Sequence, residues 1–225
     1  MRIIVIRPEP GCTQTVAAGA LAGITITPHP MFDVQAVDWT GTDPAGIDGI
    51  LLGSANAIRH GGPQLARYRH LPVYAVGAST ARFAQDQGFV IARTGAGGLQ
   101  QLIDSLPRKP LKLLRLSGKE HILLSIPAHI TLEEQVVYDN IPLPMADDMA
   151  RQLSEPALVL LHSANAAQHF ASECDRQEIR RNHIAIASLG SRIGDAAGKG
   201  WKACFVAKQP QDKALLALAA EICDR

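Results

Sequence analysis

Glycine and serine residues stand directly after several short apolar runs of this 225-residue chain. They are Ser54, Gly77, Ser79, Ser117, Gly118, Ser163, Gly190 and Ser191. A turn between an apolar strand and a helix leaves backbone N–H groups free, and the positive end of the helix dipole favours an anion. We therefore expect these turns to bind carboxylates through backbone donors.

Several of these residues also have a purely structural explanation. Ser54 and Ser163 are suitable N-caps for the helices that follow them. The structural explanation for Gly77 and Gly190 is that glycine allows a tight turn between strand and helix. The functional interpretation therefore depends on the turns converging, which parallel strands predict because their carboxyl ends meet at one edge of a sheet.

Cationic side chains stand at or beside these turns. The best placed are Arg7, Arg115, Lys119 and Arg192. A guanidinium group binds a carboxylate through two parallel hydrogen bonds, whereas a lysine acts as a point charge. We expect these cations to bind substrate carboxylates, while an ordinary surface ion pair would explain any one of them. Arg59 and Lys208 are weaker candidates for the same role.

Familiar cofactor and nucleophile motifs are missing from the sequence. Residues 95–100 (GAGGLQ) lack the last glycine of a dinucleotide-binding loop, and residues 198–200 (GKG) lack the rest of a P-loop. No serine stands in a G-x-S-x-G motif, and the histidines form no H-E-x-x-H motif. His162 precedes Ser163, but neighbouring residues at a strand end point to opposite sides, which argues against a base–nucleophile pair. We expect neither a cofactor nor a metal.

Short apolar runs alternate with segments of helical period, which predicts an α/β fold with parallel sheets. Strands are expected at 2–6, 25–27, 49–52, 73–76, 90–93, 111–116, 135–138, 157–161, 185–189 and 203–207. Helices are expected at 16–21, 78–87, 99–106, 164–173, 192–197 and 212–222. Gly23 should end the first helix in the left-handed conformation.

An internal repeat is the most informative feature of the sequence. Residues 50–57 (ILLGSANA) recur as residues 159–166 (VLLHSANA), and residues 74–79 (YAVGAS) are echoed by residues 187–191 (ASLGS). The separation far exceeds the roughly 20–50 residues of a solenoid unit and corresponds to a whole domain. We therefore expect two similar α/β lobes.

Proline-containing segments stand at equivalent places in the two halves and predict extended connectors. A chain that crosses twice between lobes would build one lobe from both termini. We expect the first lobe to comprise residues 1–32 and 142–225, and the second to comprise residues 36–137. The linkers would lie near 28–35 and 138–144.

Composition argues against several classes of protein. Lys and Arg number 22 against 21 Asp and Glu, so the chain lacks the basic excess of a general nucleic-acid binder. Its apolar runs are too short for a secretory signal or a membrane span. The four scattered cysteines form no C-x-x-C pair, which suits reduced thiols in the cytosol. We expect a cytoplasmic protein without nucleic-acid or membrane partners.

With these features, the chain resembles the uroporphyrinogen-III synthase family over essentially its whole length. The residues that carry the resemblance are 6–8 (IRP), 52–57 (LGSANA), 73–81 (VYAVGASTA), 97–99 (GGL), 137–139 (VYD), 161–166 (LHSANA) and 189–191 (LGS). Each motif is short, so the resemblance depends on the order and spacing of the motifs along the chain.

The resemblance implies two α/β lobes joined by a two-stranded linker, with the active site in the interlobe cleft. It implies a cofactor-free lyase of heme biosynthesis that cyclises linear hydroxymethylbilane to uroporphyrinogen III, with loss of water and inversion of the last pyrrole ring. Unaided closure gives the uninverted isomer, so the main task would be control of substrate conformation. We expect a monomer that receives its substrate by transient hand-over from the preceding pathway enzyme.

The resemblance also nominates a catalytic side chain. Tyr138 matches the family's strand tyrosine, whose hydroxyl is placed to assist departure of the leaving hydroxyl. A half-buried aromatic side chain without a chemical role is the structural alternative. The chain departs from many relatives by placing Arg192 and Ile193 after Gly190, where hydroxyl side chains can occur. The equivalent contact would then come from backbone, Ser191 or Arg192.

Other classes of protein fit parts of the sequence. A two-lobed cytosolic small-anion binding or sensor protein would use the same kind of cleft. A nucleotide-dependent transferase of similar architecture would need the nucleotide-binding motif that the chain lacks.

Overall fold

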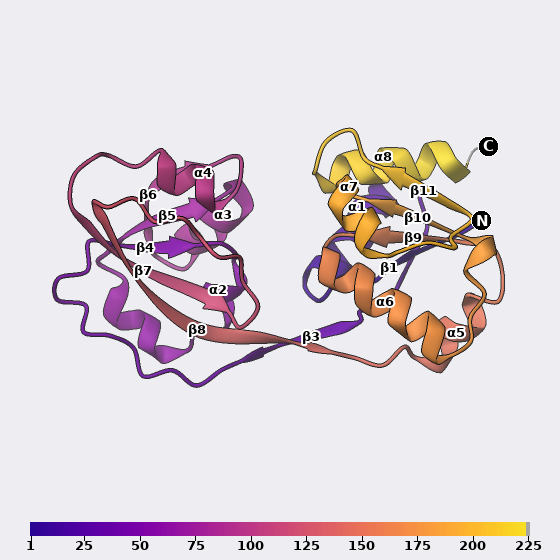
Figure 1. Ribbon diagram of the computed structural model, residues 1–225, viewed down its shortest axis with the longest axis horizontal. Coiled ribbons are helices and arrows are strands. Elements are labelled where there is room, and N and C mark those ends of the chain that lie inside the picture. The colour runs from indigo at the N-terminus through magenta and orange to yellow at the C-terminus, as the bar shows by residue number, and fades with distance from the viewer. Residues whose placement is uncertain (224–225) are drawn as a thin grey trace. The chain divides into compact units, whose positions relative to one another are not determined.

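The structure, a computed structural model, describes residues 1–223. Its elements divide into two compact units (Figure 1). Unit 1 comprises Met1–Asp33 and Ile141–Arg225, and unit 2 comprises Val34–Asn140. Unit 1 is therefore built from both ends of the chain, and unit 2 from the continuous segment between them.

Unit 1 contains a parallel five-stranded sheet in the order β11-β10-β9-β1-β2. Its strands are β1 (Arg2–Val5), β2 (Ile26–Pro28), β9 (Ala157–Leu161), β10 (Ile184–Ser188) and β11 (Ala203–Val206). Its helices are α1 (Gly11–Leu21), α5 (Asp147–Gln152), α6 (Ala164–Arg176), α7 (Ser191–Ala196) and α8 (Asp212–Cys223), with the 3-10 helix η2 (Arg181–His183). Because the strands are parallel, the turns after β1, β9 and β10 lie at one edge of the sheet.

Both faces of this sheet are covered by helices, which explains why its strands are apolar throughout. On one face Ile4 and Val159 pack against α5 and α6. On the other face Ile3 and Leu158 pack against α1 and α8. Each such buried side chain contributes roughly 1.5–3 kcal/mol relative to an exposed one.

Unit 2 contains most of a six-stranded sheet in the order β3-β8-β7-β4-β5-β6. Its strands are β3 (Phe32–Ala36), β4 (Gly49–Leu52), β5 (Pro72–Val76), β6 (Val90–Gly95), β7 (Leu111–Gly118) and β8 (Ile130–Pro142). Its helices are α2 (Asn56–His60), α3 (Ala78–Asp86) and α4 (Leu99–Asp104), with the 3-10 helix η1 (Pro63–Tyr68). The strands from β8 to β6 are parallel. Ile50 and Leu52 face α2, η1 and α3, whereas Leu51 faces α4.

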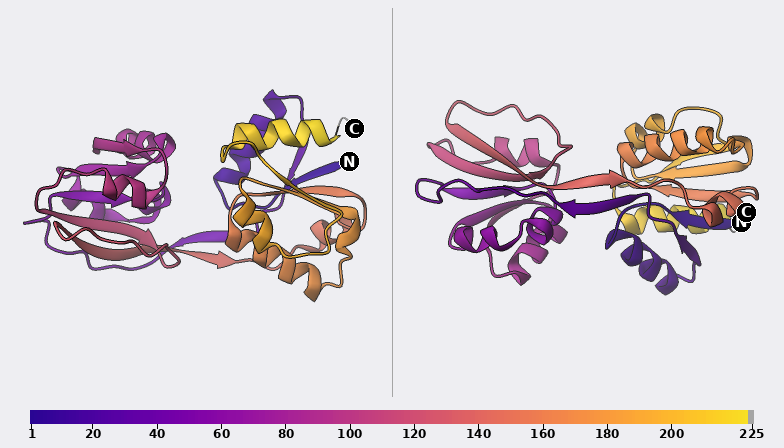
Figure 2. Two further views of the ribbon diagram at one scale, coloured as in Figure 1. Left: turned by 45° about the horizontal axis from the view of Figure 1, so that its top comes forward. Right: turned by 90° about the horizontal axis from the view of Figure 1, so that it is seen from below.

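Strands β3 and β8 both continue across the boundary between the units, at Asp33–Val34 and at Asn140–Ile141. They are neighbours in the sheet, and their arrows point in opposite directions (Figure 2). Extended connectors were predicted near residues 28–35 and 138–144. The first contains the end of β2 and most of β3, and the second contains the end of β8.

Most of the predicted elements are confirmed, with shifted ends. Gly23 has a φ of 75° after α1, as expected for a left-handed helix end. The prediction for β8 was wrong in length, since the strand starts at Ile130 and not at residue 135. Glu133 and Glu134 interrupt its apolar pattern because they pair with cations of β7. The helices α2 and α5, of five and six residues, were not predicted.

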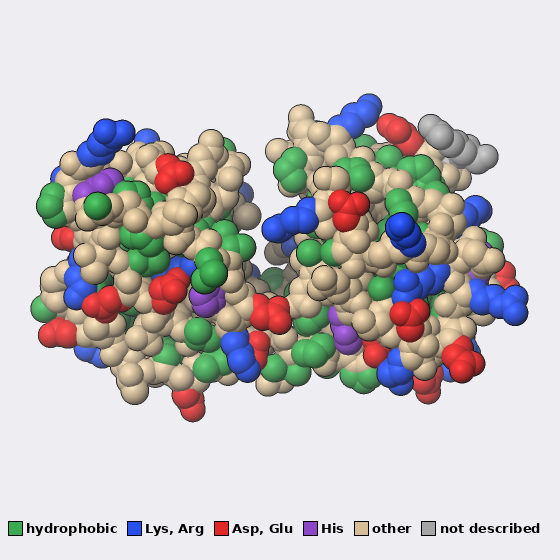
Figure 3. Space-filling view, viewed as in Figure 1, with side chains coloured by type: hydrophobic (Ala, Val, Ile, Leu, Met, Phe, Trp, Pro, Cys, Tyr) green, Lys and Arg blue, Asp and Glu red, His purple; other side chains and the backbone are tan. Residues whose placement is uncertain are grey.

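Charged side chains of both signs are interspersed on the visible face of each unit (Figure 3). This distribution agrees with the formal net charge of +1. Among residues 1–223, no helix has the length and apolar character that a membrane crossing requires.

A buried carboxylate in unit 1 makes a testable contribution to stability. Glu173 on α6 is 7% exposed; it accepts a hydrogen bond from the Met145 N–H at 2.6 Å and pairs with Arg176 at 2.7 Å. The Arg176 guanidinium is the main cause that lowers the pKa of Glu173 to about 2. A lowered pKa adds stability at pH values above the ordinary glutamate range, and this stability is lost as the pH falls towards about 2.

We expect Glu173→Gln to lower the free energy of unfolding by about 1–3 kcal/mol at pH 7, because a charged hydrogen-bond acceptor is removed. The difference from the unsubstituted protein should shrink at pH 3. Urea unfolding at both pH values measures it, with the exposed Glu221→Gln as control. A difference that is the same at both pH values would contradict the electrostatic explanation.

Candidate functional site in unit 2

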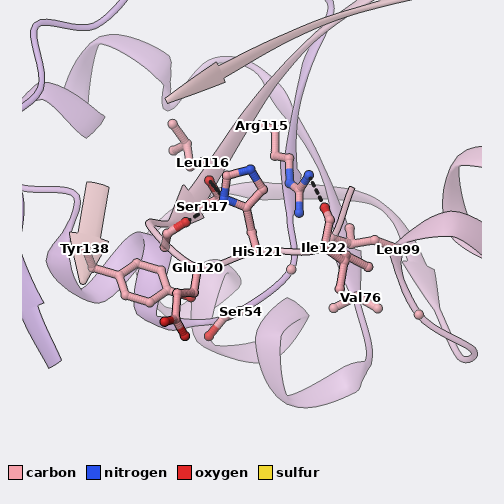
Figure 4. Close-up of a pocket in the computed structure, with 13 residues that line it drawn as sticks. Ser54, Val76, Leu99, Arg115, Leu116, Ser117, Glu120, His121, Ile122 and Tyr138 are labelled. Carbon is pink, nitrogen blue, oxygen red and sulfur yellow. Dashed lines mark hydrogen bonds between the residues drawn. The ribbon is translucent and has the colours of Figure 1, made fainter. Parts of the chain in front are cut away.

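A cavity of about 300 Å³ lies at the carboxyl edge of the unit 2 sheet. Five of the predicted site residues line it, namely Ser54, Arg115, Ser117, Gly118 and Tyr138. The other lining residues are Gly53, Val76, Gly98, Leu99, Leu116, Glu120, His121 and Ile122. The cavity therefore combines hydroxyl and charged side chains with an apolar part (Figure 4).

Tyr138 is held on β8 opposite the end of β7, where its strand register pairs it with Gly118. The side chain belongs to the apolar core of unit 2, and the residue is 8% exposed. Burial raises the pKa of the Tyr138 hydroxyl, while hydrogen bonding to Ser54 partly offsets this effect. The phenol is therefore protonated at neutral pH and can act as a proton donor.

Gly118 allows this position because it has no side chain. A Cβ atom added there would lie 2.6 Å from Cε2 and 2.7 Å from Cζ of the Tyr138 ring. Such contacts are shorter than atoms tolerate, so any other residue at 118 would displace the ring or the β7 backbone. The sequence predicted Gly118 as a substrate-binding residue, and the structure gives it this packing contact with Tyr138.

Arg115 is far less accessible than a residue expected to bind a carboxylate. Its side chain is 3% exposed, and its Nη1 lies 2.7 Å from Glu134 Oε1 on the neighbouring strand. The same Nη1 donates to the carbonyl oxygen of Ile122 at 2.9 Å. The buried Nε–H has no hydrogen-bond partner among residues 1–223, so one donor of this guanidinium remains unused beside the cavity.

A turn, residues 118–122, closes the cavity on the side of β7. His121 Nδ1 lies 2.8 Å from the carbonyl oxygen of Gly118 and 3.5 Å from Ser117 Oγ. His121 Nε2 lies 3.7 Å from Glu134 Oε2. His121, Glu120 and Glu134 were missed by sequence reasoning. The first two directly follow the predicted site residue Lys119, so extending that turn by two residues would have found them.

The remaining predicted residues of unit 2 do not line the cavity. Lys119 is exposed and forms an ion pair with Asp139, with 3.4 Å between Nζ and Oδ2. Gly77 precedes α3 with a φ of 84°, a conformation that favours glycine, and Ser79 is exposed in the first turn of α3. The weaker candidate Arg59 stacks on the Phe83 ring, 4.3 Å from its centroid.

The other predicted residues lie at the carboxyl edge of unit 1. Ser163 follows β9 and caps α6, since its hydroxyl accepts a hydrogen bond from the Ala166 N–H at 3.2 Å. Ser191 and Arg192 are exposed in the first turn of α7, which Gly190 precedes in an extended conformation. The capping interpretation of Ser163 is confirmed, and within residues 1–223 no base is paired with its side chain. The weaker candidate Lys208 is exposed in this unit.

Arg7 lies at this edge within a polar cluster. Its Nη1 is 3.3 Å from Thr15 Oγ1 and 3.8 Å from Asp212 Oδ1. Asp212 also accepts hydrogen bonds from Thr15 Oγ1 at 2.9 Å and from His162 Nε2 at 2.7 Å. Burial lowers the pKa of His162, against the effect of Asp212, so the imidazole is neutral at neutral pH. His162 is thus bound to Asp212 rather than to Ser163.

The two buried cysteines, Cys12 and Cys174, both lie in unit 1 and are poor candidates for a nucleophile. Burial raises the pKa of Cys12 to about 11 and that of Cys174 to about 12. Both thiols are free and protonated at neutral pH. Within residues 1–223, no group of three histidine, cysteine, aspartate or glutamate side chains is arranged to hold a metal ion.

Comparison with known protein families shows the family of this chain. The family model described as HEM4, uroporphyrinogen-III synthase HemD, matches residues 15–217. The chain belongs to the uroporphyrinogen-III synthase family. This membership identifies it as an enzyme and supports uroporphyrinogen-III synthesis, a step of heme biosynthesis, as its function.

Solved structures show the same α/β fold, with parallel sheets flanked by helices. A uroporphyrinogen-III synthetase from Helicobacter pylori 26695 is similar with a TM-score of 0.66 and 19% identity, covering 99% of this chain and 100% of that chain. A mutant uroporphyrinogen III synthase from the extremely thermophilic bacterium Thermus thermophilus is similar with a TM-score of 0.54 and 14% identity, covering 100% of both chains. No curated protein sequence matches the chain significantly.

Proposed function

We propose that this member of the uroporphyrinogen-III synthase family is a lyase that closes hydroxymethylbilane to uroporphyrinogen III, with Tyr138 as its proton donor. The family match over residues 15–217 is the main support for this reaction. The buried Tyr138 hydroxyl, beside a cavity with hydroxyl and charged side chains, supports its role.

The chemistry requires one proton at the leaving hydroxyl. As the bond between carbon and the terminal hydroxyl breaks, its electron pair leaves with oxygen, and the Tyr138 hydroxyl supplies the proton that makes water. Substitution of the last ring releases one proton from carbon, which restores the phenol. Because burial raises the pKa of Tyr138, the phenol holds its proton until the leaving oxygen accepts it.

The size of the cavity limits how much of the substrate it can hold. About 300 Å³ is at the lower end of the roughly 300–1,000 Å³ typical of ligand pockets. A linear tetrapyrrole is larger, so we assign the cavity to one ring and its acidic side chains. The apolar residues Val76, Leu99 and Leu116 suit the ring, and the hydroxyl groups of Ser54 and Ser117 suit a carboxylate.

The backbone of Gly118 would supply a further hydrogen bond. The other predicted contacts stay predictions: Arg7, Gly77, Ser79, Lys119, Ser163, Gly190, Ser191 and Arg192.

Further expectations about the protein also stay predictions. They are the active site in an interlobe cleft, the monomeric state, the hand-over of substrate from the preceding pathway enzyme, the independence from cofactors and the cytoplasmic location.

Incubating the protein with enzymatically generated hydroxymethylbilane tests the proposed reaction. We expect uroporphyrinogen III as the main product, because the enzyme imposes the conformation in which the last ring inverts. After oxidation, the two porphyrin isomers are separated by chromatography and measured by fluorescence. Heat-denatured protein, which should give only the uninverted isomer, is the control. The uninverted isomer alone from the native protein would refute the proposed function.

A further inference from the structure

We propose that His121 is a positioning residue for Tyr138 and acts through the backbone of Gly118. The inference rests on the proposed role of Tyr138. His121 was not among the residues predicted from the sequence, yet it lines the same cavity as Tyr138 (Figure 4).

The contact between His121 and Gly118 fixes the direction of one carbonyl group. A carbonyl oxygen can only accept a hydrogen bond, so the 2.8 Å distance assigns the proton to Nδ1 of His121. The side chain is 22% exposed, which leaves the ring mostly enclosed while it makes this bond. His121 thereby bonds to the backbone of Gly118, three residues earlier in the same turn.

The other end of the turn is fixed by an ion pair between two strands. Glu134 on β8 accepts from Arg115 on β7 at 2.7 Å, and Arg115 Nη1 donates to the Ile122 carbonyl at 2.9 Å. The second carboxylate oxygen of Glu134 lies 3.7 Å from His121 Nε2. The turn is therefore held at Gly118 by His121 and at Ile122 by Arg115.

Apolar packing does little to hold this turn. Ile122 is 50% exposed and Leu123 is 92% exposed, so neither side chain anchors the turn in a core. Without such an anchor, the backbone of residues 118–122 is held by hydrogen bonds, namely those of His121 and Arg115 and that of the Lys119 N–H to the Tyr138 carbonyl.

The position of this backbone bears directly on Tyr138. The ring packs over Gly118 so closely that an added Cβ atom would lie 2.6 Å from it. The Lys119 N–H, in the same turn, donates to the Tyr138 carbonyl at 2.9 Å. A change in the turn therefore moves both the surface under the ring and a backbone contact of the same residue. A displacement of about 1 Å can cost about 10²-fold in rate.

Two substitutions at one position separate the positioning role from mere space filling. An asparagine amide can place an N–H where His121 Nδ1 donates, whereas the longer glutamine amide reaches the position of Nε2. We expect His121→Gln to lower kcat by about 10- to 100-fold, with KM changing by less than about 3-fold. His121→Asn should retain kcat within about 3-fold of the unsubstituted enzyme. His70→Gln, an exposed histidine of the same unit, is the control.

A measurement without substrate distinguishes this inference from the proposed function. Tyrosine labelled with ¹³C at Cζ reports the surroundings and ionisation of the three tyrosines, and Tyr138→Phe assigns the Tyr138 signal. We expect the Tyr138 signal to shift in His121→Gln and to stay in place in His121→Asn.

An unmoved Tyr138 signal in His121→Gln, or equal kcat values for the Asn and Gln variants, would overturn the positioning role. A shifted signal with unchanged kcat would also overturn it, because the contact would then exist without positioning the hydroxyl for the reaction; the rate of Tyr138→Phe tests the proposed proton donor separately. If His121→Gln does not fold, as judged by its melting temperature, Glu134→Gln replaces it. That variant keeps an acceptor for Arg115 but removes the charge that faces His121, and the same shift of the Tyr138 signal decides.

Discussion

Replacing Tyr138 with phenylalanine is expected to lower kcat by about 10²- to 10⁴-fold, the range that general acid catalysis typically contributes. The ring that packs over Gly118 remains in this variant, so KM should change little. Only the hydroxyl that we propose as the proton donor is lost. Steady-state rates with freshly generated hydroxymethylbilane, together with the ratio of the two isomers, measure the effect.

A matched control separates chemistry from the general loss of a hydroxyl group. Tyr74→Phe makes the same change on β5 of the same unit, at a side chain that does not line the cavity. We expect it to keep the kcat of the unsubstituted enzyme. Equal rates for Tyr138→Phe and the unsubstituted enzyme would reduce Tyr138 to a packing residue.

Gly118→Ala is expected to lower kcat by about 10²-fold, because its methyl group would occupy the space of the Tyr138 ring. The alanine adds no charge and removes no hydrogen-bonding group. Any loss of rate therefore reports the displacement of its neighbours. Gly194→Ala in unit 1 is a suitable control, since its added Cβ meets only the Ser188 side chain, at 3.2 Å or more.

The double variant tests whether Gly118→Ala acts through Tyr138. If it does, Gly118→Ala should cost much less in the Tyr138→Phe background, because the hydroxyl that it misplaces is already absent. The rates of both single variants and the double variant form the cycle. Effects that simply multiply would mean that Gly118 affects the reaction independently of Tyr138.

Much of the fold could be predicted because it depends on local patterns. Both units cover their sheets on two faces, so strands such as β4 and β9 are continuous apolar runs. The first part of β8 could not be predicted in this way. Glu133 and Glu134 occupy a strand because they form ion pairs with Lys112 and Arg115 of the neighbouring strand, and such a partner is visible only once the strands are paired.

The candidate site was predicted in part, for a similar reason. Parallel strands bring the turns after β4 and β7 to one edge, and Ser54, Ser117 and Gly118 follow from that rule. The use of Arg115 as a buried ion-pair partner does not, because it depends on the reach of Glu134 from the next strand. The contact of His121 with Gly118 depends on the path of an irregular turn, which has no period that a sequence could show.

The division of unit 1 between the two ends of the chain has a consequence for how the protein is made. Strand β1 is synthesised before unit 2, yet β9, one of its two partners, ends only at Leu161. All of unit 2, which ends at Asn140, is synthesised in the interval. Domains generally fold as units during synthesis. Unit 2 can therefore fold first, while β1 has only β2 beside it and its other edge, which pairs with β9, stays without a partner.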